Sequence, residues 1–314
     1  MNSFFIISLD FELHWGRFDK TDLESNLSYY RQTRNSIPHV LDLFHQYGIH
    51  ATWAAVGSLM ADDKEEWKHY CPEIKPEYEK QKFSAYAWFE GQRKVWEEAL
   101  FAPDLVKKIL DYPHQELGSH TFSHYYTCET GQTNAAFKAD LEAAQRIAKD
   151  KFGYTLKSLV FPRNQMNQQA MKTAAAMGFQ TVRTNPSDWY WKNTQEENLL
   201  KKLFRTGDTL VSLGKKTSYP IPQRVKGGIL GLPASRLLRP FRNSSFFNQR
   251  RINRIKQEME EAAKTGAAYH LWWHPHNFGN LPEENLRCLE EILSHFNSLR
   301  DSFGMKSIHM GEAG

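Results

Sequence analysis

The chain has 314 residues, of which 40% are hydrophobic and 24% are charged, and its formal net charge is +4. This length is enough to bury one large core, and the ordinary hydrophobic content excludes a disordered chain. The small net charge excludes a protein that binds polyanions over its whole surface, and no apolar run is long enough to cross a membrane. No linker rich in Ser, Gly or Pro divides the chain, so we expect a single domain over residues 1–314.

The N-terminal segment and the cysteines both favour a cytoplasmic protein. Residues 1–10 lack the basic region and the small-residue cleavage site of a signal peptide. The three cysteines are an odd number at wide spacings, which indicates reduced thiols rather than a disulfide framework or a zinc knuckle.

Short apolar runs alternate with segments of helical periodicity along the whole chain. The apolar runs predict seven strands, at 4–9, 51–57, 116–120, 158–161, 181–183, 268–273 and 306–310. The helical segments are 36–47, 103–110, 134–152, 168–177, 252–264 and 283–301. This alternation implies parallel strands and right-handed crossovers, but it does not distinguish an open doubly wound sheet from a barrel. Two stretches, about 61–100 and 213–250, are predicted insertions.

Polar clusters follow several predicted strands, where parallel α/β folds place their chemistry. The first contains Asp10 and Glu12. Strand alternation directs both carboxylates to one side, where they repel each other unless they share a cation or a proton. The alternative is an acidic loop in contact with solvent.

The second cluster contains His120 and His124. Two imidazoles four residues apart suit a single metal ion if the chain coils after the strand. One carboxylate and two histidines, with coordination positions left open, are a common catalytic metal arrangement. The alternative is a chance pair, since the chain has 13 histidines.

Three further polar residues follow predicted strands. Arg163 either pairs with a buried carboxylate or lies at the surface. His274, which follows two tryptophans, is either a general acid or a core histidine whose hydrogen bonds are made within the protein. Asp188 supplies a carboxylate that would orient such a histidine.

Taken together, these motifs resemble the polysaccharide deacetylase family, the NodB-homology carbohydrate esterases of class four, over about residues 4–277. Residues 120–124 are similar to the H-[ST]-x-x-H metal motif of the family, and residues 8–12 resemble its first motif in a D-x-E form. The segments 161–163, 188–189 and 272–275 resemble the arginine, Asp-Trp and final histidine motifs. The resemblance implies an α/β fold, a distorted seven-stranded (β/α) barrel.

The resemblance also implies a role for each motif residue. Asp10 would be the general base, Arg163 would orient Asp10, and Asp188 would orient the general acid His274. A divalent metal, most often zinc, would be held by Glu12, His120 and His124. We expect Trp189 and Trp273, which belong to the same motifs, to contact the substrate.

The implied activity is removal of an N-acetyl group from an amino sugar or its polysaccharide. One alternative keeps the chemistry but acts on a lipid-linked formamido-sugar or on a small amide. A second alternative is a catalytically inactive carbohydrate-binding protein of the same fold. Nucleic acid is not an expected partner, because no matching motif is present.

One basic segment departs from the rest of the chain. Residues 215–257 contain eleven Lys or Arg and no Asp or Glu, so the remaining residues carry a net charge of about −7. Apolar residues at 228–232 and 246–247 are interleaved with the basic ones, which suits a phosphate-bearing substrate or an anionic membrane surface, here the inner face. We expect Arg236 and Arg239 to bind such a substrate. The alternative is a solvated basic lid.

Overall fold

The computed structural model describes residues 2–186, 217–221 and 228–314. Within them, nine strands form one curled sheet in the order β6-β5-β4-β3-β2-β1-β8-β7, with β9 paired to β1. Every pairing between these strands is parallel. The strands are β1 (Phe4–Phe11), β2 (Ala51–Ala55), β3 (Gln115–Ser119), β4 (Ser158–Val160), β5 (Thr181–Thr184), β6 (Leu230–Pro233), β7 (Arg236–Leu237), β8 (Ala268–Trp273) and β9 (Lys306–Ile308).

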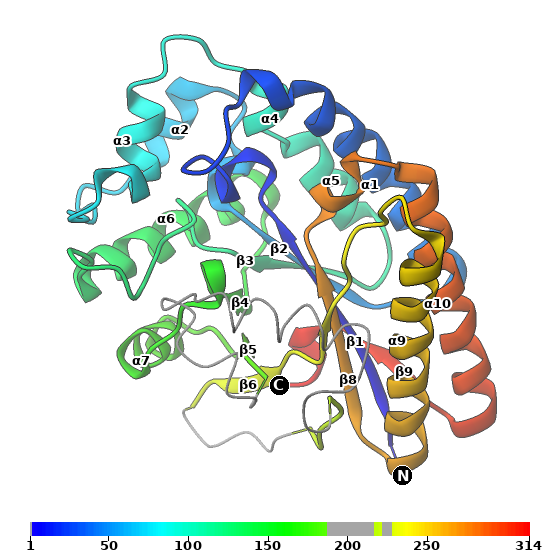
Figure 1. The fold of residues 1–314 in the computed structure, drawn as a ribbon. Helices are drawn as coiled ribbons and strands as arrows, with labels where there is room; N and C mark the ends of the chain where they lie inside the picture. Colours follow the sequence, from blue (N-terminus) through cyan, green and yellow to red (C-terminus); the bar gives the residue numbers. More distant parts are fainter. Residues whose placement is uncertain (1, 187–216, 222–227) are drawn as a thin grey trace.

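Helices surround the outside of this sheet, as Figure 1 shows. They are α1 (Leu27–Tyr47), α2 (Lys64–Tyr70), α3 (Ala85–Glu90), α4 (Glu97–Leu100), α5 (Pro103–Asp111), α6 (Asn134–Phe152), α7 (Gln168–Ala176), α9 (Ser245–Thr265) and α10 (Pro282–Phe303). None of the helices in these ranges is long and apolar enough to cross a membrane. The single domain and the cytoplasmic location stay predictions.

The predicted α/β barrel is confirmed, and all seven predicted strands are present. Two further short strands, β6 and β7, lie inside the segment that the sequence presents as an insertion. β6 pairs with β5 and β7 pairs with β8, and only Ala234 and Ser235 separate them. Ala234 donates its N–H to Thr184 of β5, whereas Ser235 donates to His270 of β8. This segment therefore bridges the two sides of the sheet and curls it toward a barrel.

Strand β1 shows how the sheet divides apolar from polar side chains. Its side chains alternate between two faces. Phe5, Ile7 and Leu9 belong to the large core beneath the helices, whereas Ile6 belongs to a smaller cluster with Val160, Leu230 and Met310. The face that carries Ile6 also carries Ser8 and Asp10. The interior of the barrel is therefore apolar at one end and polar toward the carboxyl ends of the strands.

Candidate active site

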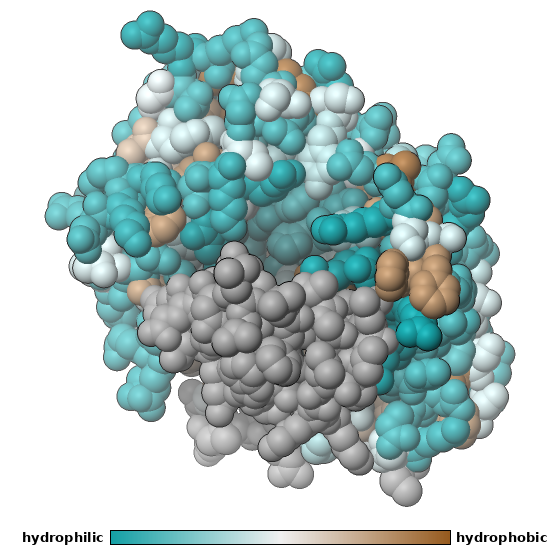
Figure 2. Space-filling model, viewed as in Figure 1, coloured by the Kyte–Doolittle hydropathy of each residue, from teal (hydrophilic) through white to brown (hydrophobic). Residues whose placement is uncertain are grey.

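Glu12, His120 and His124 converge just beyond the carboxyl ends of β1 and β3. The Oε2 atom of Glu12 lies 3.4 Å from His120 Nε2 and 3.1 Å from His124 Nε2. All three side chains are buried, and one donor atom from each lies within 4.8 Å of the others. The surface is hollowed near these strand ends (Figure 2). Among the described residues, this is the one group of three potential ligands that meets that distance.

Backbone and neighbouring groups hold the two histidines in place. His120 Nδ1 donates to the carbonyl oxygen of Val160 at 2.8 Å, which fixes the ring with Nε2 facing Glu12. The chain from His120 to His124 is an irregular turn rather than a helix, with positive φ at Thr121 (65°) and His124 (58°). The buried carboxylate of Asp140 accepts hydrogen bonds from the backbone N–H groups of residues 122 and 123, which fixes this turn.

The protonation states in this group suit a divalent cation. Burial opposes ionisation of Glu12, but the charge of His274 and hydrogen bonds from His120 and His124 hold its pKa well below the usual value. Burial lowers the pKa of His124 to about 4, so this imidazole is neutral at physiological pH. An ionised carboxylate and neutral imidazole nitrogen atoms are the donors that zinc prefers. Gly16 leaves the space that the Glu12 carboxylate fills, because a Cβ there would collide with it.

Asp10 lies beside this group, on the polar side of β1, and forms a bidentate ion pair with Arg183 of β5. The two N···O distances are 2.6 and 2.7 Å, and both side chains are buried. Burial opposes ionisation of Asp10, but the charges of Arg183 and His120 and the hydrogen bonds from Arg183 lower its pKa below the usual value. Asp10 is therefore a fixed, ionised carboxylate.

Two histidines from the segment after β8 complete the site. His274 Nε2 lies 3.7 Å from Asp10 Oδ2 and 3.6 Å from Glu12 Oε1, and its side chain is 26% exposed. His276 is buried, with Nδ1 3.7 Å from Glu12 Oε1, and burial and the charge of His274 lower its pKa to about 3. The partly exposed His274 is the one that a substrate can reach.

Comparison with known proteins identifies the family. A family model described as polysaccharide deacetylase matches residues 18–182, which is more than half of the chain. The chain belongs to the polysaccharide deacetylase family. No curated protein matches it in sequence.

Solved structures share the fold at low sequence identity. A Mycobacterium smegmatis protein assigned as a polysaccharide deacetylase is 13% identical with a TM-score of 0.61, over 99% of this chain and 88% of its own. A Pseudomonas aeruginosa PAO1 protein assigned to the same class is 12% identical with a TM-score of 0.60, over 98% and 88%. The Puue allantoinase is 12% identical with a TM-score of 0.59, over the same shares. At these identities the likeness concerns the fold alone.

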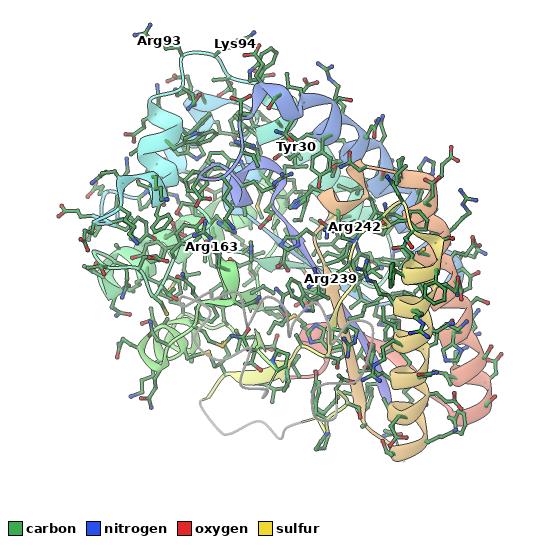
Figure 3. The ribbon with its side chains drawn as sticks, viewed as in Figure 1. Tyr30, Arg93, Lys94, Arg163, Arg239 and Arg242 are labelled. Carbon is green, nitrogen blue, oxygen red and sulfur yellow. The ribbon has the colours of Figure 1, made fainter. Side chains whose placement is uncertain are left out.

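In this polysaccharide deacetylase-family chain, the arginine on Asp10 is not the predicted one. Arg163, which is labelled in Figure 3, pairs with Asp19 instead, and its guanidinium lies 4.1 Å from the ring centre of Tyr126. Arg163 sits in a turn after β4 with a φ of 54°, whereas Arg183 lies within β5 and faces the barrel interior. The sequence signal for Arg183 was a basic residue inside a short buried strand, because a buried charge needs a partner of opposite charge.

Two predicted substrate contacts are also wrong. Trp273 is fully buried in the core beneath the helices, where it stacks on Phe278. Strand alternation places the preceding residue, Trp272, on the opposite face, with its ring 4.2 Å from the Arg183 guanidinium. Arg236 is buried in an ion pair with Glu258, at 2.6 and 2.7 Å, and so is not available to a phosphate.

Three further predicted site residues are Arg239, Asp188 and Trp189. Arg239 is half-buried beside a small pocket near the start of α9. Asp188 and Trp189 lie outside the described residues. His276, Trp272 and Arg183 are site residues that the sequence analysis missed.

A polar pocket of about 490 Å³ opens beside His276. Its lining includes the side chains of Arg17, Asn26, Tyr29 and Asn277. These groups donate and accept hydrogen bonds, and Arg17 is the only charged side chain other than a histidine among the residues lining it. The pocket therefore suits a hydroxyl-rich ligand next to the metal-binding group.

Proposed function

We propose that this protein is a metal-dependent hydrolase that removes the acetyl group from the nitrogen of an N-acetylated amino sugar. One observation carries the proposal: Glu12, His120 and His124 converge beside an ionised carboxylate, Asp10, and a partly exposed histidine, His274. Zinc is the proposed metal because the donor set is one carboxylate and two imidazoles. The hydroxyl-rich substrate class is supported by the polar pocket beside His276.

Each residue has a distinct part in the proposed reaction. Glu12, His120 and His124 would hold a divalent metal, which would supply a Lewis acid to polarise the acyl carbonyl and acidify water. Asp10 takes the proton of the attacking water, because it is ionised and a carboxylate retains acceptor sites beyond those that Arg183 fills. His274 gives a proton to the departing nitrogen, without which the tetrahedral intermediate reverts to the amide.

The completeness of this set argues against the inactive alternative. Base, acid and three metal ligands are all present, and the arginine that fixes the base is present at position 183. The polar pocket favours a sugar over a small amide, and it accepts acetylated and formylated sugars equally because both carry the same hydroxyl groups. A substrate panel must therefore contain all three classes.

The test begins with the metal content of the purified protein. Wild type should bind about one divalent ion per chain and release amine from at least one acetylated amino sugar. The double variant His120→Ala/His124→Ala should lose both metal and turnover, with an unchanged circular dichroism spectrum, because the site lies at strand ends. Stoichiometric metal in the double variant would reject the site. If the metal-loaded wild type releases amine only from formylated sugars or small amides, that class would replace the acetylated sugar as the proposed substrate.

A further inference from the structure

Arginines and exposed phenylalanines gather around the first turns of α9. We name this set the Arg–Phe patch, and it consists of Arg239, Arg242, Phe246, Phe247, Arg250 and Arg251. Phe246 is 61% exposed and Phe247 is 48% exposed. Figure 2 shows apolar atoms at this end of α9 within a hydrophilic surround. Two adjacent phenylalanines in water are unfavourable, and such exposure commonly marks an interaction surface.

Among the described residues, three arginines of the Arg–Phe patch, Arg242, Arg250 and Arg251, lack the carboxylate partners that other basic residues of this segment have. Further along the same segment, Arg236 and Arg254 pair with Glu258, and Lys256 pairs with Glu291. In the part of the chain that the structure describes, no carboxylate pairs with Arg242, Arg250 or Arg251. Burial, which is the larger cause, and repulsion from the positive charge of Arg242 together lower the pKa of Arg251. An anionic partner would relieve this repulsion.

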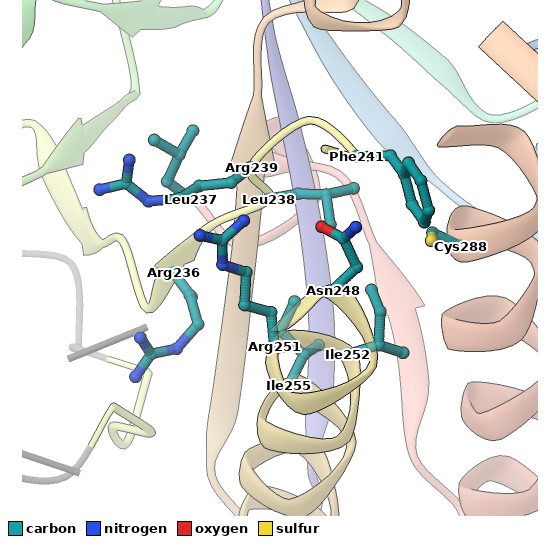
Figure 4. Close-up of a pocket in the computed structure, with 10 residues that line it drawn as sticks. All are labelled: Arg236, Leu237, Leu238, Arg239, Phe241, Asn248, Arg251, Ile252, Ile255 and Cys288. Carbon is teal, nitrogen blue, oxygen red and sulfur yellow. The ribbon is translucent and has the colours of Figure 1, made fainter. Parts of the chain in front are cut away.

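A small pocket lies within the Arg–Phe patch. Arg239, Arg251 and Asn248 line it together with apolar residues of β7 and α10. Figure 4 shows the guanidinium groups of Arg239 and Arg251 on the same side of this pocket. Its volume of about 20 Å³ excludes a sugar. Arginine forks match phosphate oxygens well.

Two buried residues, Leu238 and Trp272, connect the Arg–Phe patch to the candidate active site. Leu238, which precedes Arg239, donates its N–H to the carbonyl oxygen of Trp272 at 2.8 Å. The ring of Trp272 lies edge-on to His274, with 5.7 Å between ring centres. A surface bound at the Arg–Phe patch would therefore hold the opening of the site close to that surface.

We propose that the Arg–Phe patch docks the protein on an anionic lipid surface. Phe246 and Phe247 enter the interface between headgroups and acyl chains, while Arg242, Arg250 and Arg251 contact lipid phosphates. Interfacial aromatic side chains beside basic residues are the combination that binds such surfaces, and each basic residue there contributes to the affinity. The mixture of exposed aromatic and basic side chains favours a lipid surface over a soluble phosphate, which needs no aromatic pair.

The test is sedimentation with vesicles, which is independent of metal and of turnover. Wild type should pellet with vesicles of phosphatidylglycerol and phosphatidylcholine but not with phosphatidylcholine alone, and binding should weaken as salt rises. Arg242→Glu/Arg250→Glu should weaken binding at least tenfold. Phe246→Ser/Phe247→Ser should also weaken binding but keep the salt dependence.

The matched control is Arg93→Glu/Lys94→Glu, which makes the same change of charge on another part of the surface. Both residues are exposed and lie at the top of Figure 3, away from Arg239 and Arg242. The proposal is overturned if wild type does not sediment with anionic vesicles or if the control loses as much binding as the Arg–Phe patch variants. Release from vesicles by millimolar inorganic phosphate at constant ionic strength would instead identify a soluble phosphate site and would also overturn it.

Discussion

The guanidinium of Arg183 holds both carboxylate oxygens of Asp10, at 2.6 and 2.7 Å, from a strand 173 positions further along the chain. The same guanidinium lies over the ring of Trp272, and one of its nitrogens donates to Ser8 at 3.2 Å. These contacts fix the direction in which Asp10 can accept a proton. Arg183 is therefore the positioning residue for the proposed base.

Replacing Arg183 tests this role. Arg183→Lys keeps the charge but cannot form the bidentate contact, so turnover should fall about 100-fold while bound metal stays near wild type. The control is Arg163→Lys, which alters the pair with Asp19 and should have a much smaller effect. Steady-state amine release and metal content measure both. A larger loss in the Arg163 variant would return the positioning role to that residue.

Substitution of the two carboxylates separates base from ligand. Asp10→Asn should retain metal and lose roughly two to four orders of magnitude in turnover, the usual contribution of general-base catalysis. Glu12→Gln should lose metal, because the ionised carboxylate faces both histidines. Metal content and turnover of the two variants decide the roles. If Asp10→Asn loses metal and Glu12→Gln loses only rate, the assignments are exchanged.

Gly16 should control the position of Glu12. A Cβ at residue 16 would collide with the Glu12 carboxylate, so Gly16→Ala should displace that side chain and weaken metal binding at least tenfold. The melting temperature of the metal-free protein should change little, because the side chain that must move is a single glutamate. Gly91→Ala is the control, since its nearest contact would be an ordinary 3.4 Å. Equal metal affinity in wild type and Gly16→Ala would contradict this role of the glycine.

The ion pair between His309 and Glu116, at 3.2 Å, predicts a pH dependence of stability. Burial opposes the charge on both, yet each partner outweighs it: the pKa of His309 rises above 6.5 and that of Glu116 falls below 4.5. The raised histidine pKa adds stability that is complete below pH 6.5 and is lost as pH rises through its folded value. The lowered carboxyl pKa adds stability above pH 4.5 that is lost as pH falls through its folded value.

Urea denaturation of metal-free wild type and His309→Gln can measure this dependence. The difference in unfolding free energy should be largest between pH 4.5 and 6.5 and should shrink on either side of that window. Comparing the two proteins cancels the contributions of the other histidines. A difference that does not change from pH 5 to 9 would show that the pair adds no charge-dependent stability.

Arg236 is expected to stabilise the fold rather than to bind substrate. Among the described residues, Arg236→Ala would leave the buried Glu258 with Arg254 and Tyr269 as its partners, which should lower the free energy of unfolding by about 3 kcal/mol. Arg242→Ala, an exposed control on the same segment, should change it by less than about 0.5 kcal/mol. Urea denaturation measures both. A wild-type stability for Arg236→Ala, together with weaker substrate binding, would restore the predicted substrate role.

The sequence by itself determined seven of the strands, six of the helices and the two histidines that meet Glu12. Apolar runs and helical periodicity report local burial, so all seven predicted strands are present. Parallel strands bring their carboxyl ends to one edge, so polar residues that follow β1, β3 and β8 had to meet. The convergence of Glu12, His120, His124 and His274 follows from that rule.

Only the tertiary structure decided which long side chains meet. Arg163 and Arg183 both belong to segments near the site. Arg163 lies in a turn with left-handed backbone and pairs with Asp19. Arg183 occupies a strand position that faces inward and pairs with Asp10. The register of β8 likewise sent Trp272 rather than Trp273 toward the site. Local periodicity determines whether a residue is buried. The residue that it contacts depends on the register between strands far apart in the chain, and a long flexible side chain can reach several possible partners.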